Sequence, residues 1–333
     1  MKAFVLQRYG KRGRAGFSDM PEPELRDDEV LVSVHAAGVN QLDSKIKSGE
    51  FKLILPYRLP VILGHDVAGT VVKVGSLVSR FKPGDEVYSR PGDFCIGTFA
   101  ERIAIKETSL ALKPANLTME EAASIPLVGL TVWQALVERA NLKEGQKVFI
   151  QAGSGGVGTF AIQLAKHLGA FVATTTSTDN LRWVKELGAD LVVDYKKEDF
   201  TELLTDYDVV LNSQNSETLV KSLSVLKPGG QLVSISGPPD PSFAKAIGAN
   251  WMLNLATSLL SAGVRKKAAR LNVHYSFLFM KANGYQLQRI TALIESGAIR
   301  PVLDRVFPFD ATEEALAYVD AGRTKGKVVI AVQ

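Results

Sequence analysis

Residues 59–75, LPVILGHDVAGTVVKVG, place an imidazole and a carboxylate side by side, at His65 and Asp66, between two glycines. Nitrogen and oxygen donors of this kind bind zinc in proteins. A catalytic zinc site, however, uses three protein ligands and keeps a fourth position open for water. Whether His65 holds a metal therefore depends on what other ligands the chain can supply, and the chain has only one cysteine, Cys95.

A second stretch whose residues could take part in chemistry is the glycine-rich sequence VFIQAGSGGVGTFAIQLAKHLGA. It spaces its glycines as G-x-G-x-x-G between a predicted buried strand and a predicted helix, the context in which this pattern is a strong signal. The glycines allow a tight turn and a close approach of the backbone to a pyrophosphate, which then lies at the helix N-terminus. The alternative is a glycine-rich turn with no ligand. We predict cofactor contacts at Gly153, Ser154, Gly155, Gly156, Val157 and Gly158.

The end of the next predicted strand, TTTSTDN at 174–180, bears on which dinucleotide binds. NAD sites usually keep an acid about 20 residues after the glycines, where it accepts hydrogen bonds from the ribose. Here Thr176 stands at that position, and Ser177 could donate to a 2′-phosphate. Asp179 would repel that phosphate. We predict NADPH as the cofactor, with modest discrimination against NADH and with help from Asn180, Arg182 and Tyr195.

The elements that carry these stretches change in kind along the chain. Short β-branched segments with turn signals at 29–39, 67–75, 81–89 and 99–105 indicate a β-rich region. Residues 118–142 are predicted to be helical, with a capping box formed by Thr118 and Glu121. From residue 147, apolar strands alternate with helices, which predicts a parallel, doubly wound sheet. The last strands resemble the first region, so we expect the C-terminus to complete it.

Composition excludes several classes of function. The 333 residues carry a net charge of +4 with acids and bases interspersed, which is too weak for a nucleic-acid partner. One cysteine allows no internal disulfide, and Cys95 is expected to be a small packed residue. No apolar run reaches the roughly 18 residues of a membrane span, and the N-terminal apolar run is too short for a signal peptide. We expect a cytoplasmic protein.

Taken together, the motifs GHDVAGTVVKVG, FKPGDEVY, AGSGGVG, LGAD, LKPGG and GKVVI resemble the medium-chain dehydrogenase/reductase superfamily over the whole chain. The resemblance implies a GroES-like domain at 1–122 plus 288–333 and a Rossmann domain at 123–287. Zinc-bearing members have cysteines where this chain has Asn40 and Leu127. The lobe with four closely spaced cysteines is missing as well. We therefore predict no metal site and a structural or pocket-lining role for His65.

The stretch VNQLDSKIKSGEFK resembles zinc-independent quinone oxidoreductases and alkenal/enone reductases. In that group a lysine of this segment lies at the cofactor and the substrate, which implies this role for Lys45, although an ordinary solvent-exposed lysine is the alternative. Further cofactor contacts are predicted at Thr131, Ile235, Phe277 and Arg323.

Without a Lewis acid, the feasible reaction is hydride addition to a carbon that is already electrophilic, such as the β-carbon of an enone, enal or quinone. The protein must then place the donor near that carbon and stabilise the oxygen that becomes an enolate. Lys45 could supply a charged donor. Asn40 and Tyr57 are weaker catalytic candidates, and Tyr57 could equally be pocket wall.

Two alternatives stay open. The chain could be an NADPH-binding sensor or structural protein without catalysis, since binding needs only the Rossmann half. Residues 249–280 join an apolar helix to a basic run, which could touch a membrane surface. We expect instead a helix packed over the cofactor site or at a dimer interface. The segment YSFLFM (275–280) could form the edge strand of a homodimer.

Overall fold

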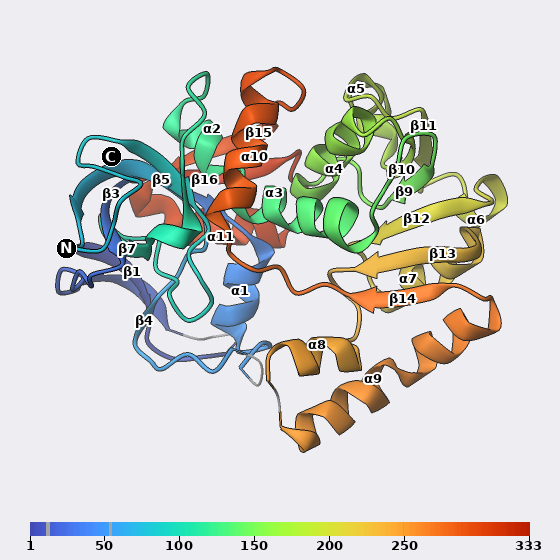
Figure 1. The fold of residues 1–333 in the computed structure, drawn as a ribbon, viewed down its shortest axis with the longest axis horizontal. Coiled ribbons are helices and arrows are strands. Elements are labelled where there is room, and N and C mark those ends of the chain that lie inside the picture. Colours follow the sequence, from blue (N-terminus) through green and yellow to red (C-terminus); the bar gives the residue numbers. More distant parts are fainter. Residues whose placement is uncertain (11–13, 53–54, 249) are drawn as a thin grey trace. The chain divides into compact units, whose positions relative to one another are not determined.

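The computed structural model describes residues 1–10, 14–52, 55–248 and 250–333. The chain divides into two compact units. Unit 1 comprises Met1–Leu130 and Lys281–Gln333, and unit 2 comprises Thr131–Met280 (Figure 1). The predicted fold class, a doubly wound sheet inserted into a β-rich region that the C-terminus completes, is confirmed. The predicted domain limits at 122/123 and 287/288 stay a prediction.

Unit 2 is built on six parallel strands in the order β11-β10-β9-β12-β13-β14 (Figure 1). This order is the dinucleotide-binding arrangement in which the first strand lies at the centre and the strand order reverses beside it. The sequence produces it because each apolar strand is followed by a helical or turn segment that returns the chain to the same end. The strands are β9 (Lys147–Ile150), β10 (Phe171–Thr176), β11 (Leu191–Asp194), β12 (Tyr207–Asn212), β13 (Leu226–Ser234) and β14 (His274–Phe277).

The core of unit 2 explains why these strands are apolar on both faces. Phe149 on β9 is fully buried, with its ring centroid 5.0 Å from that of Phe200 and 6.4 Å from that of Tyr207. A strand covered by helices on both faces has no side for polar residues. The helices of the unit are α4 (Gly156–His167), α5 (Leu181–Glu186), α6 (Phe200–Leu203), α7 (Ser216–Ser222), α8 (Pro241–Ala246) and α9 (Trp251–Arg270).

Unit 1 contains a larger, mainly antiparallel sheet in the order β15-β16-β3-β5-β6-β8, with β7 also paired to β3. The C-terminal strand pairs with β3 in the register Val329 to Gly38, so residues 291 positions apart in the chain share one sheet. Its strands are β3 (Glu29–Val39), β5 (Val67–Val74), β6 (Glu86–Ser89), β7 (Arg102–Lys106), β8 (Leu110–Leu112), β15 (Leu303–Pro308) and β16 (Lys327–Ala331).

A smaller sheet and several helices complete unit 1. The sheet has the order β2-β1-β4, with β1 (Lys2–Leu6), β2 (Ala15–Asp19) and β4 (Val61–Ile62). The helices include α1 (Gln41–Ser48), α2 (Met119–Ala123), α10 (Gly284–Glu295) and α11 (Thr312–Asp320). Because α1 follows directly on β3, the end of that strand fixes where the helix begins.

The segment predicted to be helical at 118–142 is helical but interrupted. Its capping box is confirmed, since the Thr118 hydroxyl accepts from the Glu121 N–H and the Glu121 carboxylate accepts from the Thr118 N–H. Helix α2 stops at Ala123, and α3 (Pro126–Val132) starts at a proline. Proline lacks the N–H that a continuing helix needs but suits a first turn. The last part, Trp133–Arg139, is a π-helix.

Candidate functional site

The glycine-rich loop of unit 2 connects β9 to the N-terminus of α4. A Cβ at Gly158 would lie 2.2 Å from the carbonyl oxygen of Ala152, and one at Gly153 would lie 2.3 Å from the Thr174 hydroxyl. Neither position has room for a side chain. Ala152 itself takes a positive φ of 52°, which is uncommon outside glycine. The glycine spacing therefore lets the loop fold closely on itself and against the neighbouring strand β10.

Gly155 differs from its neighbours and shows how the loop fits a dinucleotide. A Cβ there would meet only the Ala152 carbonyl oxygen, at 3.5 Å, so the protein itself leaves its side free. Gly155 is the N-cap of α4, and the first-turn N–H groups that follow it have no acceptor within the helix. An open glycine beside unpaired N–H groups at the positive end of a helix suits a phosphate.

The carboxyl ends of the parallel strands meet at one edge of the sheet, beside this loop. Thr176 ends β10, Ile235 follows β13, and Phe277 ends β14. The Ile235 N–H donates to the Asn212 carbonyl at 2.9 Å, and Phe277 packs edge-on against Phe243. The structure thus brings these predicted residues to the edge where doubly wound sheets bind ligands.

A buried polar network, which was not predicted from the sequence, lies under the same edge. The Asn212 amide donates to Gln151 Oε1 at 2.7 Å and accepts from the Ser234 hydroxyl at 2.5 Å. Gln151 in turn donates to the Ser222 hydroxyl. All four side chains are buried, so their mutual hydrogen bonds replace those that they lose to water. The network ties β9, β12, β13 and α7 together where the strand order reverses.

The end of β10 carries the residues predicted to select the cofactor. Thr176 is buried, and among the described residues its hydroxyl has no hydrogen-bond partner. The Ser177 hydroxyl accepts from the Asn180 amide at 3.0 Å, so these two predicted residues act together. Tyr195 is exposed, with its backbone N–H bound to the Thr176 carbonyl at 3.2 Å.

Two carboxylates near this strand end behave differently. Asp179 is exposed on the turn after Ser177. Asp194 lies opposite Thr176 on the neighbouring strand and accepts from the Thr178 hydroxyl at 2.6 Å. That hydrogen bond is the main cause that lowers the pKa of the Asp194 carboxyl, and so it stays ionised. This charge on β11 was not predicted from the sequence at the end of β10.

Unit 1 contains a second cluster of polar groups, around the ammonium of Lys327. Lys327 is buried, and its Nζ lies 2.5 Å from Asn40 Oδ1, 3.2 Å from the Val39 carbonyl and 3.4 Å from Asp66 Oδ2. The other oxygen of Asp66 accepts from the Leu127 N–H at 2.7 Å. Burial raises the pKa of the Asp66 carboxyl, against the opposing effects of Lys327 and Asn40.

His65 pairs with a different carboxylate. Its Nδ1 lies 2.6 Å from Asp43 Oδ1, and both side chains are fully buried. The second oxygen of Asp43 accepts from the Asn40 N–H at 2.8 Å and so caps α1. Among the described residues, Nε2 of His65 has no hydrogen-bond partner, and no cluster of three or more His, Cys, Asp or Glu could hold a metal ion.

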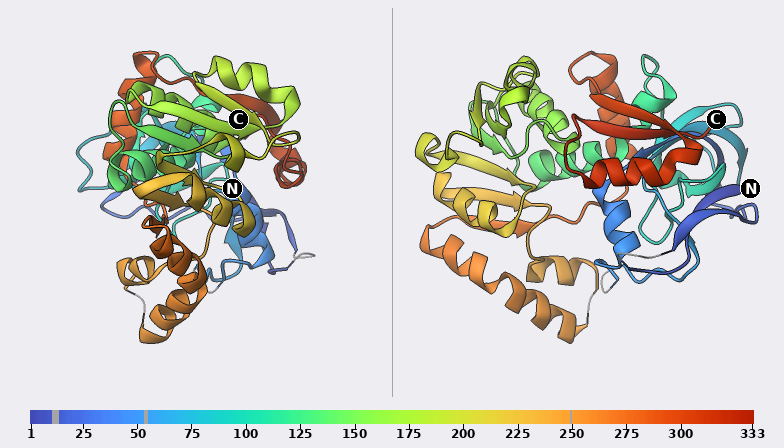
Figure 2. Two further views of the ribbon diagram at one scale, coloured as in Figure 1. Left: turned by 90° about the vertical axis from the view of Figure 1, so that its right-hand side faces the viewer. Right: turned by 180° about the vertical axis from the view of Figure 1, so that it is seen from behind.

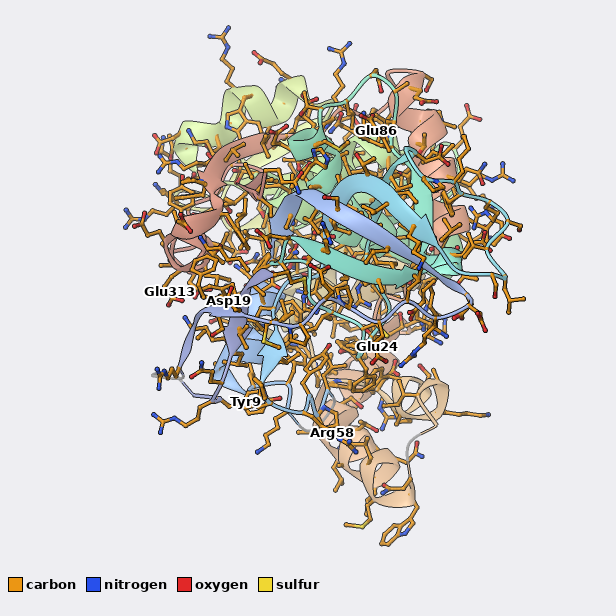
Figure 3. The ribbon with its side chains drawn as sticks, turned by 90° about the vertical axis from the view of Figure 1, so that its left-hand side faces the viewer. Tyr9, Asp19, Glu24, Arg58, Glu86 and Glu313 are labelled. Carbon is orange, nitrogen blue, oxygen red and sulfur yellow. The ribbon has the colours of Figure 1, made fainter. Side chains whose placement is uncertain are left out.

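Lys45 and Tyr57, the other predicted catalytic residues, also belong to unit 1. Lys45 is 40% exposed and lies 3.5 Å from Glu50, so its ammonium is free to move. Tyr57 is buried, its hydroxyl has no partner among the described residues, and burial raises the pKa of that hydroxyl. The Tyr9 hydroxyl, labelled in Figure 3, donates to the Tyr57 carbonyl at 2.9 Å and fixes this segment.

Thr131, Arg323 and Cys95 differ in their exposure to solvent. Thr131 is buried at the start of unit 2, whereas Arg323 is exposed in the turn before β16 of unit 1. Cys95 is exposed, so the expectation of a packed cysteine is wrong. It lies in a segment without regular structure next to Phe94, which has a positive φ of 65° and is exposed as well.

The Lys327 cluster generates a stability prediction. Lys327→Met leaves the Asp66 carboxylate buried without its cation and should lower the free energy of unfolding by about 3–5 kcal/mol at neutral pH. Lys82→Met, which removes an exposed lysine paired with Asp85, should change it by less than about 1 kcal/mol. Denaturant titrations of both variants measure the difference.

The pH dependence of stability distinguishes the loss of the Lys327 charge from the loss of its packing. A carboxyl whose pKa is higher in the folded state binds more protons when folded, so its contribution to stability rises as the pH falls. The deficit of Lys327→Met relative to wild type should therefore shrink on acidification, and adding Asp66→Asn should recover part of it. A deficit that stays constant with pH, and that Asp66→Asn does not reduce, would contradict the role assigned to this ion pair.

Comparison with known proteins agrees with the two-part architecture. The alcohol dehydrogenase GroES-like domain matches residues 26–115, and the zinc-binding dehydrogenase domain matches residues 187–330. A quinone oxidoreductase from Coxiella burnetii has the same fold with a TM-score of 0.86 and 30% identity, over 100% of this chain and 99% of that one.

Two plant enzymes are similar along nearly the whole sequence. A 2-methylene-furan-3-one reductase of Solanum lycopersicum is 36% identical, and an NADPH-dependent alkenal/one oxidoreductase of Arabidopsis thaliana, a chloroplast protein, is 35% identical. Each alignment spans 99% of this chain and 79% of the relative. The chain therefore belongs to the medium-chain dehydrogenase/reductase family, as an NAD(P)H-dependent oxidoreductase of the quinone and alkenal/enone reductase type.

Proposed function

We propose that this protein uses NADPH to reduce the carbon–carbon double bond of enones and enals, or a quinone, by hydride transfer without zinc. The observation that carries the proposal is the phosphate loop, whose open Gly155 and free helix N-terminus lie at the carboxyl edge of the sheet. The substrate class is supported by the relatives, whose names include alkenal/one oxidoreductase and quinone oxidoreductase.

NADPH, when bound, supplies the hydride that forms the new bond to the β-carbon. The electron pair of the double bond then shifts toward the carbonyl, whose oxygen becomes an enolate, and a proton added at the α-carbon completes the saturated product. The task of the protein is to hold a positive or hydrogen-bonding group against that oxygen as its charge develops. The same donors would stabilise the oxygens of a quinone as it is reduced.

Lys45 is the residue proposed to stabilise this charge. Among the described residues its ammonium contacts the exposed Glu50 carboxylate at 3.5 Å and lies 5.8 Å from the centre of the Phe51 ring, weak partners that a substrate oxygen can replace. Tyr57 keeps its proton at neutral pH because burial raises its pKa, so its hydroxyl can donate but not act as a base. Asn40 is assigned a positioning role, because its amide is already engaged with Lys327 and Asp66.

Zinc independence is proposed from the donor atoms themselves. Asp66 spends its two oxygens on Lys327, the Asn40 amide and the Leu127 N–H, and His65 uses Nδ1 on Asp43. The position that holds a cysteine in zinc-bearing members is Asn40, whose oxygen faces an ammonium. Lys327 therefore occupies Asn40 Oδ1 and Asp66 Oδ2, and Nε2 of His65, which has no partner among the described residues, cannot alone supply the three protein ligands of a catalytic zinc site.

The preference for NADPH is proposed from the strand end of β10. Ser177 and Asn180 form a small polar pair there, and no carboxylate stands at Thr176 to bind the ribose hydroxyls. One oxygen of the ionised Asp194 carboxylate is already engaged by the Thr178 hydroxyl, and Lys197 at 3.8 Å offsets part of its charge. A homodimer and a cytoplasmic location stay predictions. Among the described residues, no helix is long and apolar enough to span a bilayer.

Steady-state assays with NADPH and a panel of enones, enals and quinones test the proposal. Turnover with at least one class is expected. Tight NADPH binding with no turnover of any acceptor would instead favour the non-catalytic sensor or structural protein. One zinc ion per chain in metal analysis of the purified protein would contradict the proposed zinc independence.

The loop geometry predicts a selective effect at Gly155. Gly155→Ala should fold normally, since its φ of −82° suits any residue and the new methyl has room. It should nevertheless weaken NADPH binding about tenfold or more, because the methyl displaces the pyrophosphate from charge-assisted N–H donors. Gly16→Ala, where a Cβ meets nothing within 4 Å, is the matched control for affinity measured by titration calorimetry. Unchanged affinity in Gly155→Ala would place the pyrophosphate elsewhere.

Two lysines on one helix provide a test of the proposed catalytic charge. Lys45→Met should lower kcat/KM by roughly 10–100-fold, the value of one charge-assisted hydrogen bond in the transition state. Lys47→Met removes an ammonium from the same turn of α1 but one that pairs with Glu313 of α11 (labelled in Figure 3), and it should change kcat/KM by less than about twofold. Equal effects of the two substitutions would show that helix stability, and not charge, is responsible.

Cofactor choice can be shifted at an exposed position. Asp179→Lys replaces a repelling charge with an attractive one beside the proposed 2′-phosphate and should raise the NADPH-to-NADH ratio of kcat/KM about tenfold. Glu217→Lys makes the same change of charge on the exposed surface of α7 and serves as the control. If Asp179→Lys leaves the ratio unchanged, the phosphate does not bind at the end of β10.

A further inference from the structure

Helix α9 of unit 2 turns its apolar side chains outward. Its buried positions are Thr257, Ser261, Val264 and Ala268, which are small or polar. Leu253 is partly buried, but the other large apolar residues of its first half are exposed by more than half: Trp251 by 74%, Met252 by 60%, Leu255 by 53%, Leu259 by 68% and Leu260 by 65%. A helix that packs on a core normally shows the reverse pattern.

The inward face of α9 needs no other partner. The Ser261 hydroxyl donates to the Thr257 carbonyl at 2.7 Å, and the Thr257 hydroxyl donates to the Asn254 carbonyl at 3.0 Å. These polar groups are satisfied within the helix itself. The helix runs along the outside of unit 2 beyond β14 in each view (Figures 1 and 2). The outer apolar side chains are thus exposed on a helix whose buried Thr257 and Ser261 hydroxyls already have hydrogen-bond acceptors.

The charge of this region is as uneven as its hydrophobicity. Residues 241–280 contain five basic residues and no acidic one: Lys245, Arg265, Lys266, Lys267 and Arg270. The other 34 basic residues of the chain nearly balance its 35 acidic residues. The positive net charge of the protein therefore resides in this segment, and the interspersed charges expected from the whole sequence do not describe it.

Apolar and basic groups share the outward face of α9. Successive helix residues are offset by about 100°, which places Leu255 and Leu259 on the same side as Lys266. Exposed Trp and Leu beside Lys and Arg are the composition of helices that lie in the interface of an anionic bilayer. An apolar protein partner would account for the leucines but not for the absence of any acid across forty residues.

We propose that the outer face of α9, with Lys245 of α8, binds the surface of a membrane that contains anionic lipids. Leu255 and Leu259 enter the boundary of the acyl chains, Trp251 lies at the level of the headgroups, and the basic residues face the lipid phosphates. Ala249, which precedes the helix, lies outside the described residues. The proposal does not depend on the reaction that the protein catalyses.

Flotation of the full chain with lipid vesicles tests the proposal. The protein should bind vesicles of phosphatidylcholine with phosphatidylserine, and binding should weaken with rising salt. Leu259→Ser should weaken it about tenfold and Lys266→Gln about fivefold. Leu77→Ser and Lys82→Gln alter equally exposed residues of unit 1 and should have no effect. The emission of Trp251 should shift to the blue on binding, and Trp251→Phe should abolish that shift.

Two results would overturn the proposal. The first is failure to bind vesicles of phosphatidylcholine with phosphatidylserine, or binding that Leu259→Ser and Lys266→Gln leave unchanged. The second is a dimer in analytical ultracentrifugation that Leu259→Ser dissociates, since the face would then be covered by a second copy of the chain. Circular dichroism of each variant verifies that loss of binding is not loss of the fold.

Discussion

The ammonium of Lys327 connects segments of unit 1 that lie far apart in the chain. It comes from the C-terminal strand and meets the end of β3, the N-cap of α1 and the His65-Asp66 turn, while Asp66 in turn holds the start of α3. A buried cation is stable only where carboxylate and carbonyl oxygens surround it, so the partners must arrive together. The helix that carries Lys45 is thereby fixed through Asn40 and Asp43, and so is its place relative to the sheet.

Features that depend on residues close together in the chain can be predicted from the sequence, whereas features that depend on distant residues cannot. The phosphate loop and the Thr118 capping box follow from spacings of three to five residues, and both were predictable. The Lys327 cluster was not, because residues near 40, 66 and 327 meet only once the C-terminal strand has paired with β3. Exposure also depends on distant residues. Cys95 is exposed although its residue type suggested packing, and the weakly amphipathic sequence of α9 does not show which of its side chains face outward.

The proposed chemistry and the proposed membrane surface are compatible on physical grounds. Quinones with apolar tails and enals derived from lipids partition into bilayers, so an enzyme held at the membrane surface would meet them at a higher local concentration. The two features reside on separate elements, the phosphate loop before α4 and the outer face of α9. Either one can therefore be altered without changing the residues of the other.

Conjugate hydride transfer is the central claim, and the destination of the hydride tests it most directly. NADPH labelled with deuterium at the transferred position, incubated with the enzyme and an enone, should place deuterium on the β-carbon of a saturated ketone, as detected by NMR and mass spectrometry of the product. Deuterium on the carbonyl carbon, in an allylic alcohol, would contradict the account, because it would show direct carbonyl reduction of the kind that a Lewis acid assists.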